Sequence, residues 1–367
     1  MTRFGLVINL ALTVAVLPLV ARAVTYTAAD TFDLNNTTLL GTGSVSFAKG
    51  AFGSQQVGYG GGSSTGFSYH ALLWSATAAS AVDLNPALLG TNSQSYAFGT
   101  SGGQQVGYGY GDSTGTNNHA LLWTGTAASA VDLNPTFSLF SLANGTSGGQ
   151  QVGYGYTASQ YHALLWTGTA ASAVDLNPAV LLGTNSLSVA NGTSGSQQVG
   201  YGYGGNTGSF YHALLWTGTP ASAVDLNPAA LLGTNSSSQA FGISGSQQVG
   251  SGYGANTGGA TNVHALLWTG TAASAADLNP ATLLGTNSVS SANATNGSQQ
   301  VGYGQGGNTG GNPHALLWTG TAASAVDLHA LLPAGFSSSQ ATAIDPYGNI
   351  VGFTNSHAVE WLAGDLY

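Results

Sequence analysis

The 367-residue sequence contains no cysteine and only three basic residues, Arg3, Arg22 and Lys49. Without cysteine the chain cannot form disulfides, so a folded chain must be stabilised by a core of its own. Without a basic patch it has no electrostatic term for binding nucleic acid or anionic lipid. Charged residues make up 4% of the chain, so solubility must come from Ser, Thr, Asn, Gln and Gly. These absences exclude nucleic acid as a partner.

The sequence also lacks helical periodicity, and beyond residue 23 it has no apolar run long enough to cross a bilayer. It is still not a disordered chain. Hydrophobic residues make up 43% and aromatic residues 10%, which is more than a chain unable to form a core would carry. We therefore expect a folded protein built from strands.

The N-terminus has the pattern of a secretory signal peptide. Arg3 supplies the positive start, residues 4–20 are almost wholly apolar, and Ala21-Arg22-Ala23 is a small-x-small cleavage site. A membrane anchor is the alternative, but the run is slightly short and Pro18 interrupts it. We expect residues 1–23 to be removed after Ala23 and residues 24–367 to be secreted as one repeat domain.

One motif recurs seven times. His-Ala-Leu-Leu-Trp begins at six histidines and returns as His-Ala-Val-Glu-Trp at the seventh, with steps of 49, 43, 50, 52, 50 and 43 residues. The histidines are His70, His119, His162, His212, His264, His314 and His357. The matching tryptophans are Trp74, Trp123, Trp166, Trp216, Trp268, Trp318 and Trp361. Repeats of this length are typical of propellers, solenoids and arrays.

Each repeat predicts four short strands separated by Gly, Asn and Pro turns. Both faces of each strand are apolar or small, as a sheet packed between two others requires. We therefore predict an all-β fold, a seven-bladed β-propeller of four-stranded blades. Residues 24–35 resemble the end of a repeat whose start is missing, so they should supply the outer strand of the last blade and close the ring. The alternative is an open β-solenoid.

The repeats resemble the HAF-type extracellular repeat of bacterial secreted proteins. The last repeat carries the resemblance best, with Ser339-x-Ala-x-x-Ile344, Gly348-x-Ile-Val-Gly352 and His357-Ala-Val-Glu-Trp361. The other six have Gln-Gln-Val-Gly and His-Ala-Leu-Leu-Trp in the same places. They depart from the family in having Leu where it usually has Phe after His-Ala. The resemblance implies export and a propeller-like fold, and it transfers no catalytic residues.

The repeated histidines invite a metal site with the Asp of each Ala-Val-Asp-Leu segment. Each repeat supplies only one His and one Asp, whereas a zinc site needs three or four converging ligands. We expect each His instead to hydrogen-bond a nearby Asp, Ser or Thr within its blade, and each Trp to fill the core between blades. No metal or cofactor is predicted.

Catalytic residues are hard to find among near-identical repeats. Glu360, the only glutamate, stands where the other repeats have Leu, and Asp345 shares its repeat. Two carboxylates with different pKa values could act as acid and base. A hydrolase with its site in this last, divergent repeat is therefore one alternative, although the primary prediction is that the chain is not an enzyme.

The loops before each His-Ala vary in length and sequence, and variable loops on a repeated scaffold mark either drift or a recognition face. They carry aromatic and amide side chains suited to sugar rings, namely Tyr110, Tyr156, Tyr203, Tyr253, Asn206, Asn256 and Asn308. Plain turn chemistry is the alternative. The primary prediction is a secreted, non-catalytic protein that binds polysaccharide or surface glycans, and a self-associating surface or matrix component is a further alternative.

Overall fold

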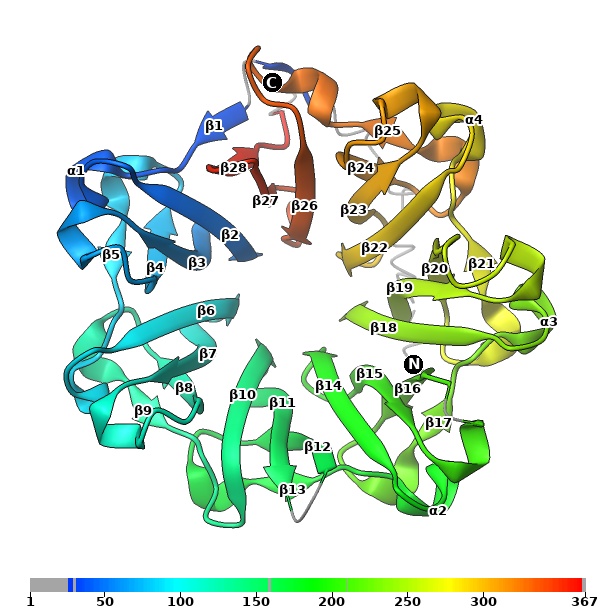
Figure 1. Ribbon diagram of the computed structural model, residues 1–367, viewed down its shortest axis with the longest axis horizontal. Coiled ribbons are helices and arrows are strands. Elements are labelled where there is room, and N and C mark those ends of the chain that lie inside the picture. The colour runs from blue at the N-terminus through cyan, green and yellow to red at the C-terminus, as the bar shows by residue number, and fades with distance from the viewer. Residues whose placement is uncertain (1–25, 29–30, 158–159, 209, 365–367) are drawn as a thin grey trace, which may run out of the picture.

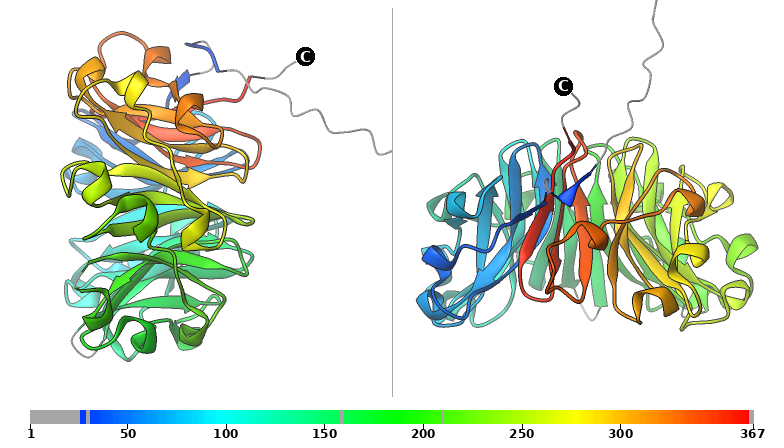
Figure 2. Two further views of the ribbon diagram at one scale, coloured as in Figure 1. Left: turned by 90° about the vertical axis from the view of Figure 1, so that its right-hand side faces the viewer. Right: turned by 90° about the horizontal axis from the view of Figure 1, so that it is seen from above.

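The protein forms a ring of seven blades around a central channel (Figure 1). The structure is a computed structural model, and it describes residues 26–28, 31–157, 160–208 and 210–364. Each blade is one four-stranded antiparallel sheet. Seen from the side, the ring is a flat disc whose strands run between its two faces (Figure 2). The predicted propeller is thus confirmed, and the open solenoid is wrong. The signal-peptide prediction lies outside the described residues.

The blades follow one another along the chain, each from its innermost to its outermost strand. Blade 1 comprises β2 (Val45–Phe52), β3 (Gln55–Gly61), β4 (His70–Ser75) and β5 (Val82–Asp83). Blade 2 comprises β6 (Gln94–Ser101), β7 (Gln104–Tyr110), β8 (His119–Trp123) and β9 (Val131–Asp132). Blade 3 comprises β10 (Ser138–Ser147), β11 (Gln150–Thr157), β12 (Gln160–Trp166) and β13 (Val174–Asp175). Blade 4 comprises β14 (Leu187–Thr193), β15 (Gln198–Tyr203), β16 (His212–Trp216) and β17 (Val224–Asp225).

Blade 5 comprises β18 (Ser237–Ser244), β19 (Gln247–Tyr253), β20 (His264–Trp268) and β21 (Ala276–Asp277). Blade 6 comprises β22 (Val289–Thr295), β23 (Gln300–Gln305), β24 (His314–Trp318) and β25 (Val326–Asp327). Blade 7 comprises β26 (Ser339–Ile344), β27 (Ile350–Thr354), β28 (Ala358–Trp361) and β1 (Thr31–Asp33). Single helical turns connect some blades at the outer rim, namely α1 (Thr37–Leu40), α2 (Ala179–Leu182), α3 (Ala229–Leu232) and α4 (Ala281–Leu284).

The ring is closed by the N-terminal strand. β1 pairs antiparallel with β28, with Phe32 opposite Glu360, and so completes blade 7 from the other end of the chain. Asp33 supplies the carboxylate that blade 7 lacks in its own repeat, and its Oδ2 lies 2.7 Å from Nδ1 of His357. This confirms the prediction that residues 24–35 hold the missing outer strand.

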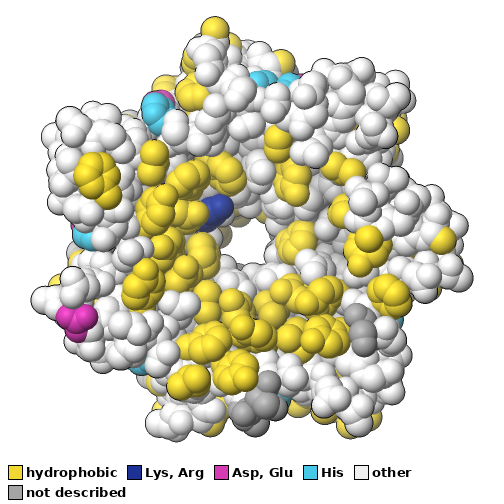
Figure 3. Space-filling view, in the orientation of Figure 1, with side chains coloured by type: hydrophobic (Ala, Val, Ile, Leu, Met, Phe, Trp, Pro, Cys, Tyr) yellow, Lys and Arg dark blue, Asp and Glu magenta, His cyan; other side chains and the backbone are white. Residues whose placement is uncertain are grey.

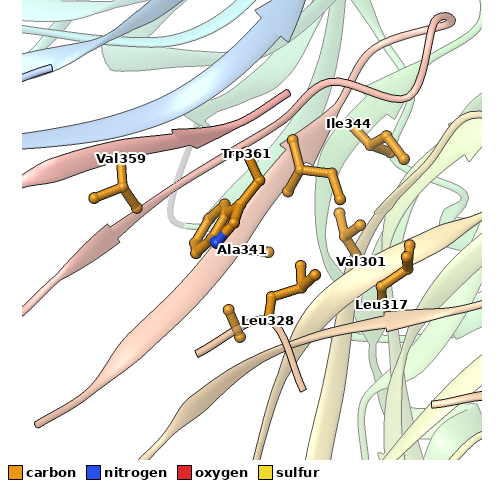
Figure 4. Packing of buried hydrophobic residues seen from close by; sticks show 9 residues of the cluster. Val301, Leu317, Leu328, Ala341, Ile344, Val359 and Trp361 are labelled. Carbon is orange, nitrogen blue, oxygen red and sulfur yellow. The ribbon is translucent and has the colours of Figure 1, made fainter. Parts of the chain in front are cut away.

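A tryptophan fills the gap between each pair of neighbouring blades. All seven indoles are fully buried, and there is one apolar cluster for each gap. Between blades 6 and 7, for example, Trp361 packs against Leu317 and Leu328 of the preceding blade (Figure 4). The blades therefore adhere through large apolar contacts and not through charge, which suits a chain with so few ionic residues.

Each His-Ala-Leu-Leu-Trp histidine is held by hydrogen bonds within its blade. His70 Nδ1 lies 2.7 Å from Asp83 Oδ2, and the same pair recurs in the other blades. Asn85 then accepts a hydrogen bond from Ser95 of the next blade, whose hydroxyl accepts one from the Ala71 amide. The polar network thus ties one blade to the next at the strand ends.

Every innermost strand carries a β-bulge at the same point. In blade 2 the register shifts between Ala97 and Gly99, so Phe98 is the extra residue. Gly107 pairs with Ala97 beside the bulge, and a Cβ added to it would come within 1.8 Å of the Tyr96 carbonyl oxygen. The strands approach so closely there that only glycine fits, which explains the Val-Gly of each repeat.

We predict that Gly107→Ala lowers the free energy of unfolding by about 3 kcal/mol or more, because the methyl group must displace backbone. Gly205→Ala is the matched control, since Ala255 already occupies the equivalent loop position in blade 5. It should change stability by less than about 0.5 kcal/mol. Urea denaturation measures both. Equal losses in the two variants would contradict the close approach at the bulge.

Candidate functional site

The candidate site lies at the wall of the channel, where the bulged residues of the seven innermost strands form a ring. We call these seven residues the bulge ring, and they are Lys49, Phe98, Asn144, Asn191, Phe241, Asn293 and Thr342. Together with Gln340 and Phe353 they line a cavity of about 460 Å³ inside the channel. A cavity of this size can hold part of a peptide or a small molecule.

The polar members of the bulge ring brace the blades. Asn144 Nδ2 donates to the Ala190 carbonyl of the next blade at 2.9 Å, and Asn191 and Asn293 make the equivalent bond at 2.8 Å. Thr342 Oγ1 donates in the same way to Ala48 at 2.8 Å. The amide nitrogens are thereby used, while Asn144 and Asn191 keep their side-chain oxygens as acceptors at the channel wall.

Aromatic side chains line one side of the channel on the face shown in Figure 3, which we call the front mouth. In blades 7, 1 and 2 the rings form a connected series with centroids 4.7–5.5 Å apart. This aromatic arc runs in the order Phe353, Phe47, Tyr59, Tyr96, Tyr108 and Phe98. Burial raises the pKa of Tyr108 to about 12, so its hydroxyl stays neutral at physiological pH.

Further rings extend the apolar band over blades 3 and 4. Tyr154 and Tyr156 each lie 5.6 Å from Tyr161, and Tyr201 lies 5.2 Å from Tyr211. The band is visible as a crescent of hydrophobic side chains around part of the channel (Figure 3). Blades 5 and 6 interrupt it with polar residues at the equivalent strand pairs, Gln239 opposite Ser251 and Ser291 opposite Tyr303. The front mouth is therefore apolar on one side and polar on the other.

Lys49 is the one basic residue in the part of the chain that the structure describes. Its Nζ lies 4.4 Å from the centre of the Phe353 ring and 5.8 Å from that of Tyr59. Within the described ranges every ion pair joins a His to an Asp, so Lys49 has no carboxylate partner there. Burial lowers the pKa of Lys49 to about 8, because the charged ammonium is poorly solvated beside the rings.

The two carboxylates of the last repeat are inaccessible. Glu360 is fully buried where blade 7 meets blade 1, and its Oε1 accepts a hydrogen bond of 2.8 Å from Gln56. Burial, reinforced by Asp345, raises the pKa of Glu360 to about 7. Asp345 is also fully buried and accepts hydrogen bonds from the backbone of Tyr347 and from Asn349. A perturbed acid is thus present, but neither Glu360 nor Asp345 lines the channel cavity.

The loop residues chosen from the sequence take two kinds of place. Asn206, Asn256 and Asn308 are exposed at the outer rim, where each donates a 3.0 Å hydrogen bond to a carbonyl of α2, α3 or α4. The tyrosines lie at the ends of the second strands and are half-buried. Tyr156 stacks on Phe140, with ring centres 5.5 Å apart, and Tyr203 meets Tyr211 edge-on. The seven residues therefore do not converge on one site.

Sequence reasoning missed the bulge ring and the aromatic arc. One signal was available, because the residue that follows the alanine of each innermost strand changes chemical type, while that alanine is the same in all seven repeats. It reads Lys, Phe, Asn, Asn, Phe, Asn and Thr around the ring.

Among the described residues no three His, Asp or Glu side chains gather closely enough to hold a metal ion. Nor does any helix in these ranges have the length and apolar character to span a membrane.

No protein-family model and no curated protein matches the sequence, but solved structures do. Puromycin hydrolase matches with a TM-score of 0.53 and 11% identity over 93% of this chain and 55% of that chain. The β-propeller domain of the Trilobed protease from Pyrococcus furiosus matches with a TM-score of 0.53 and 6% identity, over 87% of this chain and 96% of that domain. Pyrococcus horikoshii acylaminoacyl peptidase matches with a TM-score of 0.51 and 7% identity, over 90% of this chain and 53% of that chain. The chain thus spans about half the length of puromycin hydrolase and of the peptidase.

These comparisons correct the functional prediction made from the sequence. The proteins with which the chain shares its fold are a hydrolase, a protease and a peptidase, so the prediction of a polysaccharide-binding protein is wrong. The hydrolase alternative fits these neighbours better. The sugar-binding argument rested on loop Tyr and Asn residues, and the three asparagines are occupied in bracing the rim turns.

We predict that Lys49→Met raises the free energy of unfolding at pH 7 by about 1–3 kcal/mol, because a poorly solvated charge is removed. The unfolded chain keeps this proton up to pH 10.5, whereas the folded chain loses it near pH 8. The wild type should therefore gain stability between pH 8 and 10.5, and the advantage of the variant should shrink. Lys49→Arg, which keeps its charge, should show no gain. Denaturation at pH 7 and pH 10 measures this, and a less stable Met variant at pH 7 would contradict it.

Proposed function

We propose that this protein binds extended peptide segments at the front mouth of its channel and serves as the substrate-binding propeller of a peptide-hydrolysing system. The observation that carries the proposal is the aromatic arc, a connected set of rings beside a channel on an otherwise polar, weakly charged molecule. Grouped apolar side chains at a surface opening mark a binding site.

The chemistry of the front mouth suits a peptide. Apolar side chains can pack on the rings of blades 1–4, since aromatic faces bury large areas without needing charge. Backbone N–H groups can donate to the free amide oxygens of Asn144 and Asn191, which line the cavity in blades 3 and 4. The protonated Tyr108 hydroxyl can donate to a peptide carbonyl.

The fold comparisons support a role in peptide hydrolysis, because a propeller of this kind occurs as a domain of the Trilobed protease. We assign this chain the binding step and not the cleavage step. Asp345 and Glu360, the carboxylates on which the hydrolase alternative depended, are fully buried and lie outside the cavity. The reacting groups would then come from a second domain or chain.

The proposal also keeps two expectations from the sequence. The signal-peptide pattern of residues 1–23 supports an activity outside the cytoplasm, and the HAF-type resemblance supports the same location. Peptide binding of this kind would serve the capture of extracellular polypeptides.

We predict that Tyr108→Ser weakens the binding of fluorescently labelled apolar hexapeptides at least fivefold, because it interrupts the aromatic arc between Tyr96 and Phe98. Serine is compatible with the fold at this position, since Ser251 occupies it in blade 5. Tyr303→Ser, at the same position in blade 6 outside the arc, is the matched control and should bind like the wild type. Fluorescence anisotropy gives the affinities.

Two outcomes would count against the proposal. Equal losses in the two variants would indicate a general effect on the fold and not a site in the arc. The second is self-association in the absence of peptide, measured by light scattering. It would indicate that the aromatic arc contacts a second copy of the protein and not a peptide.

A further inference from the structure

The strongest remaining feature is Lys49, whose charge neither the fold nor aromatic packing explains. The repeat does not require a cation at the bulge, because the equivalent positions hold Phe98, Asn144 or Thr342. The side chain braces no neighbouring blade in the manner of Asn144 and Thr342. Its contacts are the faces of Phe353 and Tyr59. A lone cation with aromatic neighbours and no counterion is a site prepared for an anion.

The surroundings of Lys49 limit which anion fits. All other charges of the described chain are carboxylates or His–Asp pairs away from the cavity, so nothing else there attracts an anion. One positive charge matches one negative charge, which favours a carboxylate over a phosphate. The adjoining Phe353 and Phe47 rings would contact apolar groups on the same ligand.

The position of Lys49 along β2 indicates how the carboxylate would arrive. Phe47 comes first in the strand and belongs to the aromatic arc, and Lys49 follows two residues later inside the cavity. Figure 3 shows the lysine at the wall of the channel, next to the hydrophobic crescent. A chain entering from the front mouth would therefore pass the rings before its leading end reached the ammonium.

We propose that Lys49 binds the C-terminal carboxylate of a peptide that enters the channel end-on with its last apolar side chains against the aromatic arc. This inference rests on the proposed peptide-binding function and makes it specific for free chain ends. The lowered pKa of Lys49 accords with it, because a carboxylate would supply the solvation that the rings do not.

The test compares three hexapeptides with the same apolar sequence, a free acid, a C-terminal amide, and an amide in which the last residue is replaced by Glu. Wild-type protein should bind the free acid about tenfold more tightly than the amide, as for a hydrogen bond to a charged group. The Glu-containing amide should bind like the plain amide, since its carboxylate sits on a side chain and not at the chain end.

Lys49→Asn is the test variant, because Asn already occupies the bulge in blades 3, 4 and 6. It should bind acid and amide with affinities within about twofold of each other, while Lys49→Arg should keep the preference. Thermal denaturation verifies folding, and Lys49→Arg gives a second reading if the Asn variant fails to fold.

The outcomes separate this inference from the proposed function. Equal binding of acid and amide by the wild type, or a preference that survives Lys49→Asn, would overturn the role of Lys49 while leaving peptide binding at the arc intact. Tight binding of the Glu-containing amide would overturn the preference for chain ends. Failure of every peptide to bind would overturn the proposed function, and this inference with it.

Discussion

The fold depends on one repeated constraint, the filling of each gap between blades by an indole. Twisted sheets set around an axis leave wedge-shaped gaps, and a Trp from each blade packs against the Val and Leu side chains of the blade before it. The same fully buried residue fills the gap in every repeat, so the seven gaps are packed alike around the ring. The last gap closes because Trp74 reaches blade 7 and β1 completes that blade.

The same constraint determines where the repeats can differ. A bulged residue lies outside the strand pairing and outside the apolar clusters between blades, so its chemical type can vary without changing the packing of the indoles. This freedom accounts for the mixture of amide, phenyl and ammonium groups around the bulge ring. We expect Lys49 to lower stability at neutral pH, since its charge is poorly solvated, and such a cost is common at sites that serve binding.

The sequence was sufficient to predict the blades, the buried tryptophans and the use of the N-terminal strand, because these follow from motif period and strand alternation. It was not sufficient for the front mouth. Tyr59 and Tyr303 stand in the same Val-Gly-Tyr-Gly context. Of the two, only Tyr59 has ring neighbours, since Tyr69 approaches it from the loop before β4 and Tyr96 from β6. Strand alternation alone also does not give the direction of the Lys49 side chain, because a bulge shifts by one position which residues face the channel.

We propose the front mouth, and not the rim loops, as the binding surface. A crystal structure of the protein with a free-acid apolar hexapeptide tests this most directly. We expect density for the peptide across the aromatic arc, with its terminal carboxylate within hydrogen-bond distance of Lys49 Nζ. Peptide density beside Asn206, Asn256 or Asn308 at the rim, or at the opposite end of the channel around Thr100 and Thr146, would contradict the claim.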